Sequence, residues 1–189
     1  MEGDFMSNQK NIRQTAPRLS NEKMNQITKE SICRAMLLLL KEKDFQNISI
    51  TELTQKAGVS RNGFYRNYNA KDDILSELIA TFNKGLFITI GSPVFGQGAL
   101  EWYHHLFSVL RSQSNTLIRL MDAGARGEFL QATSDHLLKN HPDASTEERY
   151  RLLAWNGALL NIIHDWLFSG MKESDEKMAL LCSGLLYSF

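Results

Sequence analysis

The sequence has few of the features that mark secreted or membrane-spanning proteins. It has two cysteines among 189 residues, Cys33 and Cys182, so no disulfide framework is expected and a reducing, cytoplasmic compartment fits best. The longest apolar run, residues 35–40, is far shorter than the roughly 20 residues of a membrane-spanning helix. The opening MEGDFMSNQK lacks the apolar segment of a secretory signal, and Met6 is a second candidate start beside Met1.

Proline and glycine are also scarce, with three and twelve residues, and they cluster at a handful of places. No stretch alternates apolar and polar residues in the way that a half-buried β-strand does. Hydrophobic residues make up 43% of the chain, which is enough for a buried core. We therefore expect an all-α protein of long helices joined by short loops.

The chain has 21 basic and 21 acidic residues and so no net charge, but the two signs are unevenly placed. Residues 1–71 hold twelve Lys or Arg and seven Asp or Glu, a net charge of +5. The remainder holds nine basic and fourteen acidic residues, a net charge of −5. A basic first part joined to an acidic remainder predicts a polyanionic partner for the first part only.

Two short helices with clear start signals lie in the basic part. The four residues SITE, at positions 49–52, have the spacing of a capping box, in which the serine caps the helix and the glutamate returns to its amide. Gly58 supplies the permissive residue of a tight turn, and Ser60 then caps a second short helix that reaches Tyr68. Helix, glycine turn and helix at this spacing predict a helix-turn-helix, whose second helix enters the major groove of DNA.

Helical spacing predicts which side of this second helix is free. Phe64 and Tyr68 share one face and are expected to point inward. On the other side, Arg61 and Asn62 match the hydrogen-bonding patterns of guanine and adenine. Gly63 would let the backbone approach the groove floor closely, the alternative being that it is simply a tolerated surface glycine. Side chains suited to phosphate oxygens are Tyr65, Asn67 and Lys71.

These residues carry a resemblance to a known family. Residues 32–75, with the segments SITEL, AGVS and FYRNY followed by Lys71-Asp72, resemble the DNA-binding domain of the TetR family, the tetracycline-repressor-like regulators. The chain departs from the usual family pattern at Gly63, at Asn67 and at residues 69–70, which affects the operator sequence rather than DNA binding. Together with the outward face, the resemblance predicts these DNA-binding residues: Thr51, Ser60, Arg61, Asn62, Gly63, Tyr65, Arg66, Asn67 and Lys71.

The predicted organisation has three parts. Residues 1–19 are polar and aperiodic, and we expect them to form a flexible arm. Residues 20–84 are expected to hold the three-helix helix-turn-helix domain and the first part of a connecting helix. The first helix of this domain should begin near Asn21, capped by Ser20. Residues 85–189 should form a larger helical bundle for effector sensing and dimerisation.

The last two long helices, expected at 146–169 and 175–189, are apolar enough to be buried on more than one side. Residues 159–178 also resemble a subgroup of TetR-family regulators from low-GC Gram-positive bacteria with a Trp and Gly-Met signature. Family resemblance implies that these helices pair with their symmetry mates in a four-helix interface, the alternative being the core of a single chain. The predicted dimer residues are Leu152, Leu159, Ile163, Trp166, Met178, Leu181 and Leu185.

Aromatic residues are concentrated in two segments of the second part. A site for a small-molecule effector is predicted there, because apolar, aromatic cavities with few polar groups are typical ligand sites. The alternative is that these aromatic side chains are plain core. The predicted pocket residues are Trp102, Tyr103, Phe107, Trp155 and His164. No metal or cofactor site is expected, since the adjacent His104 and His105 diverge by about 100° on a helix.

The sequence thus predicts a sequence-specific DNA-binding regulator, a ligand-responsive repressor that acts as a homodimer on a near-palindromic operator. An enzyme is not expected, because phosphate-binding loops, nucleophile elbows and Cys/His metal spacings do not occur in the sequence. The alternative is a helical interaction regulator or co-activator with a TetR-like fold. Such a protein would respond to a protein partner or would have lost operator binding.

Overall fold

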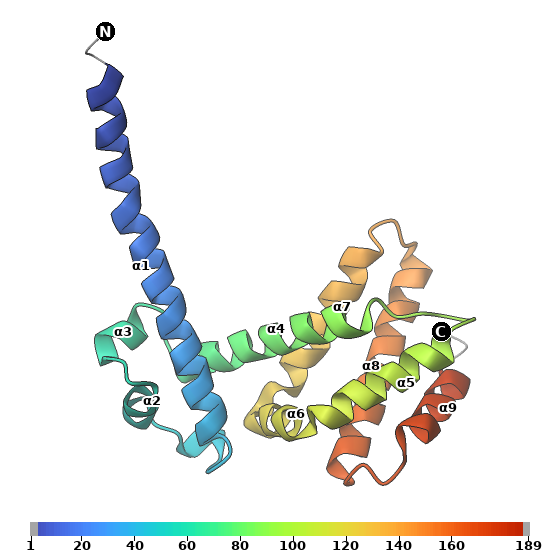
Figure 1. Cartoon of the computed structure of the whole chain (residues 1–189). Coiled ribbons are helices and arrows are strands. Elements are labelled where there is room, and N and C mark those ends of the chain that lie inside the picture. The colour runs from blue at the N-terminus through green and yellow to red at the C-terminus, as the bar shows by residue number, and fades with distance from the viewer. Residues whose placement is uncertain (1–3, 187–189) are drawn as a thin grey trace. The chain divides into compact units, whose positions relative to one another are not determined.

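A computed structural model describes the backbone of residues 4–186 and the side chains of residues 21–186. Helices run through this part of the chain and no β-strand occurs within it, which confirms the predicted all-α fold class (Figure 1). Contacts divide the chain into two compact units, residues 1–74 and residues 75–189.

The first unit is a small helical domain built on the C-terminal half of α1 (Asp4–Leu39). Its other elements are the one-turn η1 (Phe45–Asn47), α2 (Ile50–Ala57), α3 (Arg61–Tyr65) and the beginning of α4 (Lys71–Ile90). Helix α1 packs against both α2 and α3. The buried core of this unit includes Ile32, Met36, Leu39, Phe45, Ile48, Leu53, Phe64, Tyr68 and Ile74.

Helix α1 begins earlier than the sequence predicts. It starts at Asp4 and not near Asn21, so Ser20 does not cap a helix start, and the backbone of residues 4–19 is helical. These residues have no apolar stripe, but Gln, Lys, Arg and Met are good helix formers. A helix that is nucleated by the packed residues further along can extend through them. Residues 1–3 lie outside the described part, and the flexibility of the arm remains a prediction.

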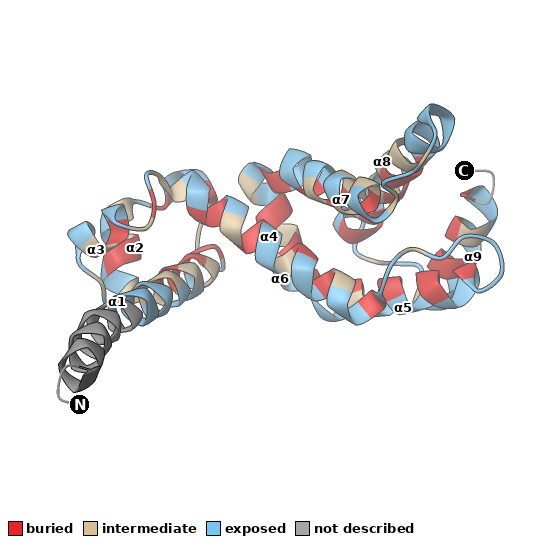
Figure 2. Ribbon diagram, turned by 90° about the horizontal axis from the view of Figure 1, so that it is seen from above, coloured by how far each residue is buried: buried red, intermediate tan, exposed pale blue. Residues whose placement is uncertain are grey.

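The second unit holds the rest of α4 and all later helices. These are α5 (Ala99–Ser112), α6 (Ser114–Leu120), the π-helical turn η2 (Met121–Ala125), α7 (Arg126–Asn140), α8 (Thr146–Phe168) and α9 (Asp175–Leu185). Helix α5 packs along α9, and α7 packs along α8. Buried and exposed residues are interleaved along these helices (Figure 2). Within η2, Gly124 takes a positive φ of 95°, which changes the direction of the chain between α6 and α7.

The boundary between the units lies after Ile74, earlier than the predicted boundary after residue 84. Aromatic contacts explain the difference, because they join most of α4 to the second unit. Phe82 packs edge-to-face on Phe129 with ring centroids 5.8 Å apart, and Phe87 stacks on His136 at 3.6 Å. Among the described helices, none is both long enough and apolar enough to cross a membrane.

Candidate nucleic-acid interface

Local hydrogen bonds build the turn between α2 and α3. The Ser49 hydroxyl accepts from the Glu52 amide at 3.2 Å and the Glu52 carboxylate accepts from the Ser49 amide at 3.1 Å, which confirms the predicted capping box. Gly58 ends α2 in the left-handed conformation, with φ 67°. The Ser60 hydroxyl accepts from the Gly63 amide at 3.0 Å and so caps α3. These bonds fix the angle at which α3 leaves α2.

Two aromatic side chains hold α3 to its unit, as the sequence predicts. Phe64 is fully buried and Tyr68 is 4% exposed, with ring centroids 5.9 Å apart. The Tyr68 hydroxyl lies 3.5 Å from the Cys33 sulfur, and the Lys29 ammonium lies 5.2 Å from the centre of the Tyr68 ring. Helix α3 itself ends at Tyr65, before the predicted end at Tyr68. The two anchors thus lie at the end of α3 and just beyond it.

The outward side of α3 carries exposed polar side chains and no acid. Arg61, Asn62, Tyr65 and Arg66 are all exposed, and Tyr65 keeps 56% of its surface accessible. Arg61 Nη2 donates to the hydroxyl of Thr51, which is also exposed, at 2.5 Å. The structure therefore brings together two residues predicted to meet bases, one from α2 and one from α3.

Gly63 and Asn67 do not belong to this outward side. A side chain at Gly63 would meet Ser60 Oγ at 3.3 Å and the Thr28 methyl of α1 at 4.0 Å, so the position faces protein and not the groove floor. Asn67 is half-buried, and its Nδ2 donates to the Gly63 carbonyl at 2.8 Å. Positions 63 and 67 share one face of the turn because they are four residues apart. The interpretation of Gly63 as a groove-facing residue is thus corrected by the direction of its missing side chain.

Lys71, predicted to anchor a phosphate, has internal partners. Its ammonium donates to the carbonyls of Phe45, Gln46 and Ile48 at 2.7, 3.1 and 3.1 Å. It also lies 4.5 Å from the centre of the Phe45 ring. An ammonium has three N–H donors, and these carbonyls use all three. In this structure Lys71 therefore closes the η1 turn, and a phosphate would have to displace at least one of these bonds.

A comparison with protein-family models finds a match in this part of the chain. Residues 32–78 match the family model of the bacterial regulatory proteins of the tetR family. Residues 32–78 are thus similar to the helix-turn-helix domain of that family, and we name them the TetR-type domain.

One curated relative shares sequence with this chain. An uncharacterized HTH-type transcriptional regulator of Bacillus subtilis (strain 168), YxbF, is 35% identical over 63 residues. The matched stretch covers 33% of this chain and 17% of that protein, so the similarity spans a small part of the relative's length.

A solved structure extends the likeness beyond the TetR-type domain. The dihydroxyacetone kinase operon activator DhaS is similar over 85% of this chain and 94% of its own, with a TM-score of 0.55. The two sequences are 18% identical, so the similarity concerns the fold alone. It agrees with a TetR-type domain followed by a helical second unit.

The aromatic residues predicted to line an effector pocket form core in the second unit. Trp102, Tyr103, Phe107 and Trp155 are each at most 6% exposed. The Trp155 indole N–H donates to the Tyr103 hydroxyl at 2.8 Å, and burial raises the pKa of Tyr103 to about 12. His164 is half-buried and stacks on Phe168 at 4.4 Å. Most of this cluster is thus the plain core that the sequence left open as an alternative.

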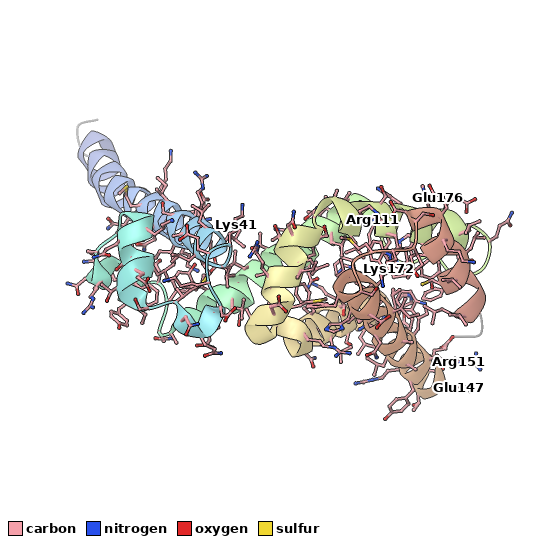
Figure 3. The ribbon with its side chains drawn as sticks, turned by 90° about the horizontal axis from the view of Figure 1, so that it is seen from below. Lys41, Arg111, Glu147, Arg151, Lys172 and Glu176 are labelled. Carbon is pink, nitrogen blue, oxygen red and sulfur yellow. The ribbon has the colours of Figure 1, made fainter. Side chains whose placement is uncertain are left out.

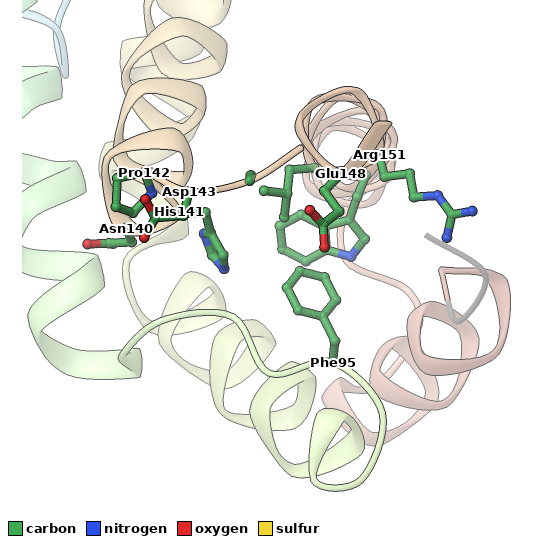
Figure 4. A pocket seen from close by; sticks show the side chains of 10 residues that line it. Phe95, Asn140, His141, Pro142, Asp143, Glu148 and Arg151 are labelled. Atoms are coloured by element: carbon green, nitrogen blue, oxygen red, sulfur yellow. The ribbon is translucent and has the colours of Figure 1, made fainter. Parts of the chain in front are cut away.

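A cavity of about 510 Å³ lies beside this aromatic core, and of the five predicted pocket residues it is lined by Trp155 alone. Its other walls come from the α4–α5 loop, which contributes Phe95, and from the α7–α8 connection, which contributes His141 (Figure 4). The start of α8 completes it with Glu148 and Leu152. The sequence did not predict the loop residues, because only the fold brings them next to α8.

The predicted dimer residues fall into two groups. Leu181 and Leu185 on α9 are 38% and 64% exposed, and Leu152 is half-buried. The others are buried inside the unit: Leu159, Ile163, Trp166 and Met178. For these four residues the structure shows a position in the core of the single chain, which was the alternative. The sequence could not decide, because an apolar position looks the same whichever surface covers it.

Arg111 organises the connection between α8 and α9, and sequence reasoning missed it. Its Nε donates to Asp175 at 2.6 Å, its Nη2 to the Glu173 carbonyl at 2.7 Å and its Nη1 to the Met171 carbonyl at 3.3 Å. The guanidinium lies 4.9 Å from the centre of the Trp166 ring. Figure 3 shows Arg111 beside the connection that carries Lys172. A structural latch thus joins α5 to the start of α9, formed by Arg111 with Trp166, Asp175 and the carbonyls of Met171 and Glu173.

Proposed function

We propose that this protein is a sequence-specific DNA-binding transcriptional regulator that acts in the cytoplasm as a homodimer. The observation that carries the proposal is the outward side of α3. It presents exposed hydrogen-bonding side chains while Phe64 and Tyr68 hold its other side to the core. Such a polar face on a TetR-type domain is what major-groove reading requires.

Arg61 and Asn62 are the proposed base-reading residues, since their side chains fit the edges of guanine and adenine. Thr51 supports Arg61 through the hydrogen bond between them. Tyr65 and Arg66, both exposed, are proposed to bind phosphate oxygens and so to fix the register on the duplex. Ser60 acts through its cap on α3. Gly63, Asn67 and Lys71 contribute by shaping the domain.

A homodimer would place two such helices on half-sites about 34–36 Å apart, which gives a near-palindromic operator. The exposed Leu181 and Leu185 of α9 and the exposed Phe168 at the end of α8 offer apolar surface to a second copy. Effector binding in the second unit would then change how the two reading helices are presented, a rigid-body switch. We propose a repressor, although the solved structural neighbour is named an operon activator.

The test is selection of bound fragments from random duplex DNA, followed by affinity measurements at several salt concentrations. A palindromic consensus, with log affinity falling linearly against log salt, is the expected result. Arg61→Ala should lose about 1–3 kcal/mol of operator affinity and accept more sequences. Arg149→Ala, in the second unit, is the matched control and should bind as the wild type does.

The alternative, a helical interaction regulator, predicts a different outcome for the same experiment. Selection would then return no consensus, and Arg61→Ala would bind DNA no differently from Arg149→Ala. That result would exclude operator reading by α3.

A further inference from the structure

The cavity beside Trp155 has one aromatic wall. Phe95 of the α4–α5 loop packs edge-to-face against Trp155, with ring centroids 5.2 Å apart. Phe95 keeps 39% of its surface accessible although it is a large apolar residue. The Trp155 indole N–H is already bonded to Tyr103, so Trp155 offers this cavity ring surface and no hydrogen-bond donor. Leu152 extends the same wall by one turn of α8.

The same cavity also offers acceptors. The Glu148 carboxylate accepts from the Ser145 amide at 2.8 Å, and the backbone and hydroxyl hydrogen bonds from Ser145 lower the pKa of Glu148. This carboxyl is therefore ionised at neutral pH. His141 Nδ1 lies 2.8 Å from the Leu137 carbonyl. Since a carbonyl only accepts, Nδ1 carries a proton in this contact.

Charge at the cavity favours a cation. Of the described residues that line it, Asp143 and Glu148 are acidic and Arg151 is the one permanent cation. Arg151 Nη2 donates to Glu147 at 2.8 Å, and Glu147 is not among the lining residues. Figure 4 shows the Arg151 guanidinium extending away from Phe95 and Glu148. An anionic ligand would thus meet two carboxylates, whereas a cationic ligand would meet the Phe95 ring and an ionised acid.

We propose that this cavity binds a small organic cation, an ammonium with an aromatic or branched alkyl body. The cationic head would lie against the accessible ring of Phe95, close to the Glu148 carboxylate, because aromatic rings and carboxylates both attract a desolvated cation. The apolar body would fill a volume of about 510 Å³, which lies within the range typical of small-molecule sites. Binding of the cation does not depend on the proposed function. Only the interpretation of the cation as an effector rests on that function.

Isothermal titration of the full chain, without DNA, tests the ligand class. Benzyltrimethylammonium is the cationic probe, neopentylbenzene is its neutral isostere, and phenylmethanesulfonate is the anionic probe. The cation should bind at least about tenfold more tightly than either of the others, as a cation–π contact combined with an ion pair predicts. Equal affinity for the cation and its isostere, or tighter binding of the anion, would overturn the proposal.

Matched variants locate the site. Glu148→Gln removes the charge but keeps a side chain that supports a capping box, so the fold should survive. It should weaken binding of the cation about five- to tenfold and leave the neutral isostere unchanged. Phe95→Leu keeps an apolar side chain but removes the ring, and should weaken the cation about threefold. Glu128→Gln, on α7, is the control and should bind as the wild type does; a loss equal to that of Glu148→Gln would place the cation elsewhere.

The two proposals fail separately in these experiments. Cation binding by a protein that selects no DNA consensus would contradict the proposed function and leave the cavity assignment standing. Operator binding by a protein that does not distinguish the cationic probe from its isostere would contradict the cavity assignment and support the proposed function.

Discussion

Two basic residues of the TetR-type domain have the same charge and different tasks. The Arg61 guanidinium is exposed and, among the described residues, donates to the Thr51 hydroxyl, whereas the Lys71 ammonium donates to three carbonyls in and just after η1. A side chain whose donors are all used inside the protein has little left for a phosphate. The partners of a basic residue, more than its charge, therefore decide whether it serves binding or folding.

Lys71→Met should lower the free energy of unfolding by about 1–3 kcal/mol, because hydrogen bonds to a charged group are among the stronger ones. Denaturant unfolding of the full chain measures this change. In binding experiments with the folded variant, the slope of log affinity against log salt should match the wild type. A slope shallower by about one unit would instead show that Lys71 neutralises a phosphate.

Gly63→Ala should leave DNA affinity within about twofold of the wild type, because the added methyl would point at Ser60 and Thr28 and not at DNA. Helix propensity favours alanine by about 0.8–1 kcal/mol. Displacement of the Ser60 hydroxyl from its cap would offset this gain, since a lost cap costs about 0.5–2 kcal/mol. The net change in unfolding free energy should therefore stay below about 1 kcal/mol. A large loss of operator affinity at unchanged stability would restore the groove-facing interpretation.

Much of the candidate DNA-binding face could be predicted from the sequence, because residues four apart on a helix share a side whatever the rest of the fold does. That rule placed Phe64 and Tyr68 inside and left Arg61 and Asn62 outside. The roles of Asn67 and Lys71 could not be predicted in the same way. Their hydrogen-bond partners, the Gly63 carbonyl and the η1 carbonyls, are set by backbone geometry.

At the scale of helices, starts that depend on short-range hydrogen bonds were predictable. The caps at Ser49, Ser60, Ser145 and Ser174 all form, because each involves atoms only three residues apart. The start of α1 was not predictable from such a signal. It depends on how far a helix extends beyond its packed part, which is a matter of small propensities.

The capping box of α2 gives the stability of the protein a component that depends on pH. The hydrogen bond from Lys43 and those from the Ser49 amide and hydroxyl lower the pKa of Glu52 to about 2. A carboxyl whose pKa falls on folding stabilises the folded state when it is ionised. This contribution is complete above its unfolded pKa, near 4.5, and is lost as the pH falls toward 2.

Glu52→Gln should therefore flatten the fall in unfolding free energy between pH 4.5 and pH 2, although Gln still permits a capping box. Denaturant unfolding at a series of pH values measures the slope. Lys43→Met removes the largest single cause and should flatten the curve partly. An unchanged slope in both variants would show that the carboxyl has no such partners in solution.

At the scale of the whole molecule, the proposed homodimer raises the question of which apolar surface would meet a second copy. Periodicity identified apolar faces on α8 and α9 but could not separate residues that face their own core from residues that face a partner. The structure separates residues buried within the single chain from residues that remain accessible. Trp166 and Met178 are buried within the unit, whereas Leu181 and Leu185 keep accessible surface on α9.

Leu185→Glu should make the protein monomeric, as measured by sedimentation equilibrium. Leu185 is 64% exposed, so the fold should tolerate the change. In a two-fold symmetric dimer both subunits carry the substitution at the interface. The loss of two buried leucines should weaken dimerisation by about 100-fold or more. Leu130→Glu alters a residue on α7 that is 42% exposed, and this control should remain dimeric. A dimer that persists in Leu185→Glu would place the interface on another surface.

The Arg111 latch also bears on the order of events when two copies meet. It holds the first turn of α9 to α5 within one chain, so the leucines further along that helix are already in position before a partner arrives. In the proposed homodimer, association would then join two surfaces that are already folded in each chain. A newly made subunit would fold by itself, and its dimerisation would then depend on the concentration of subunits.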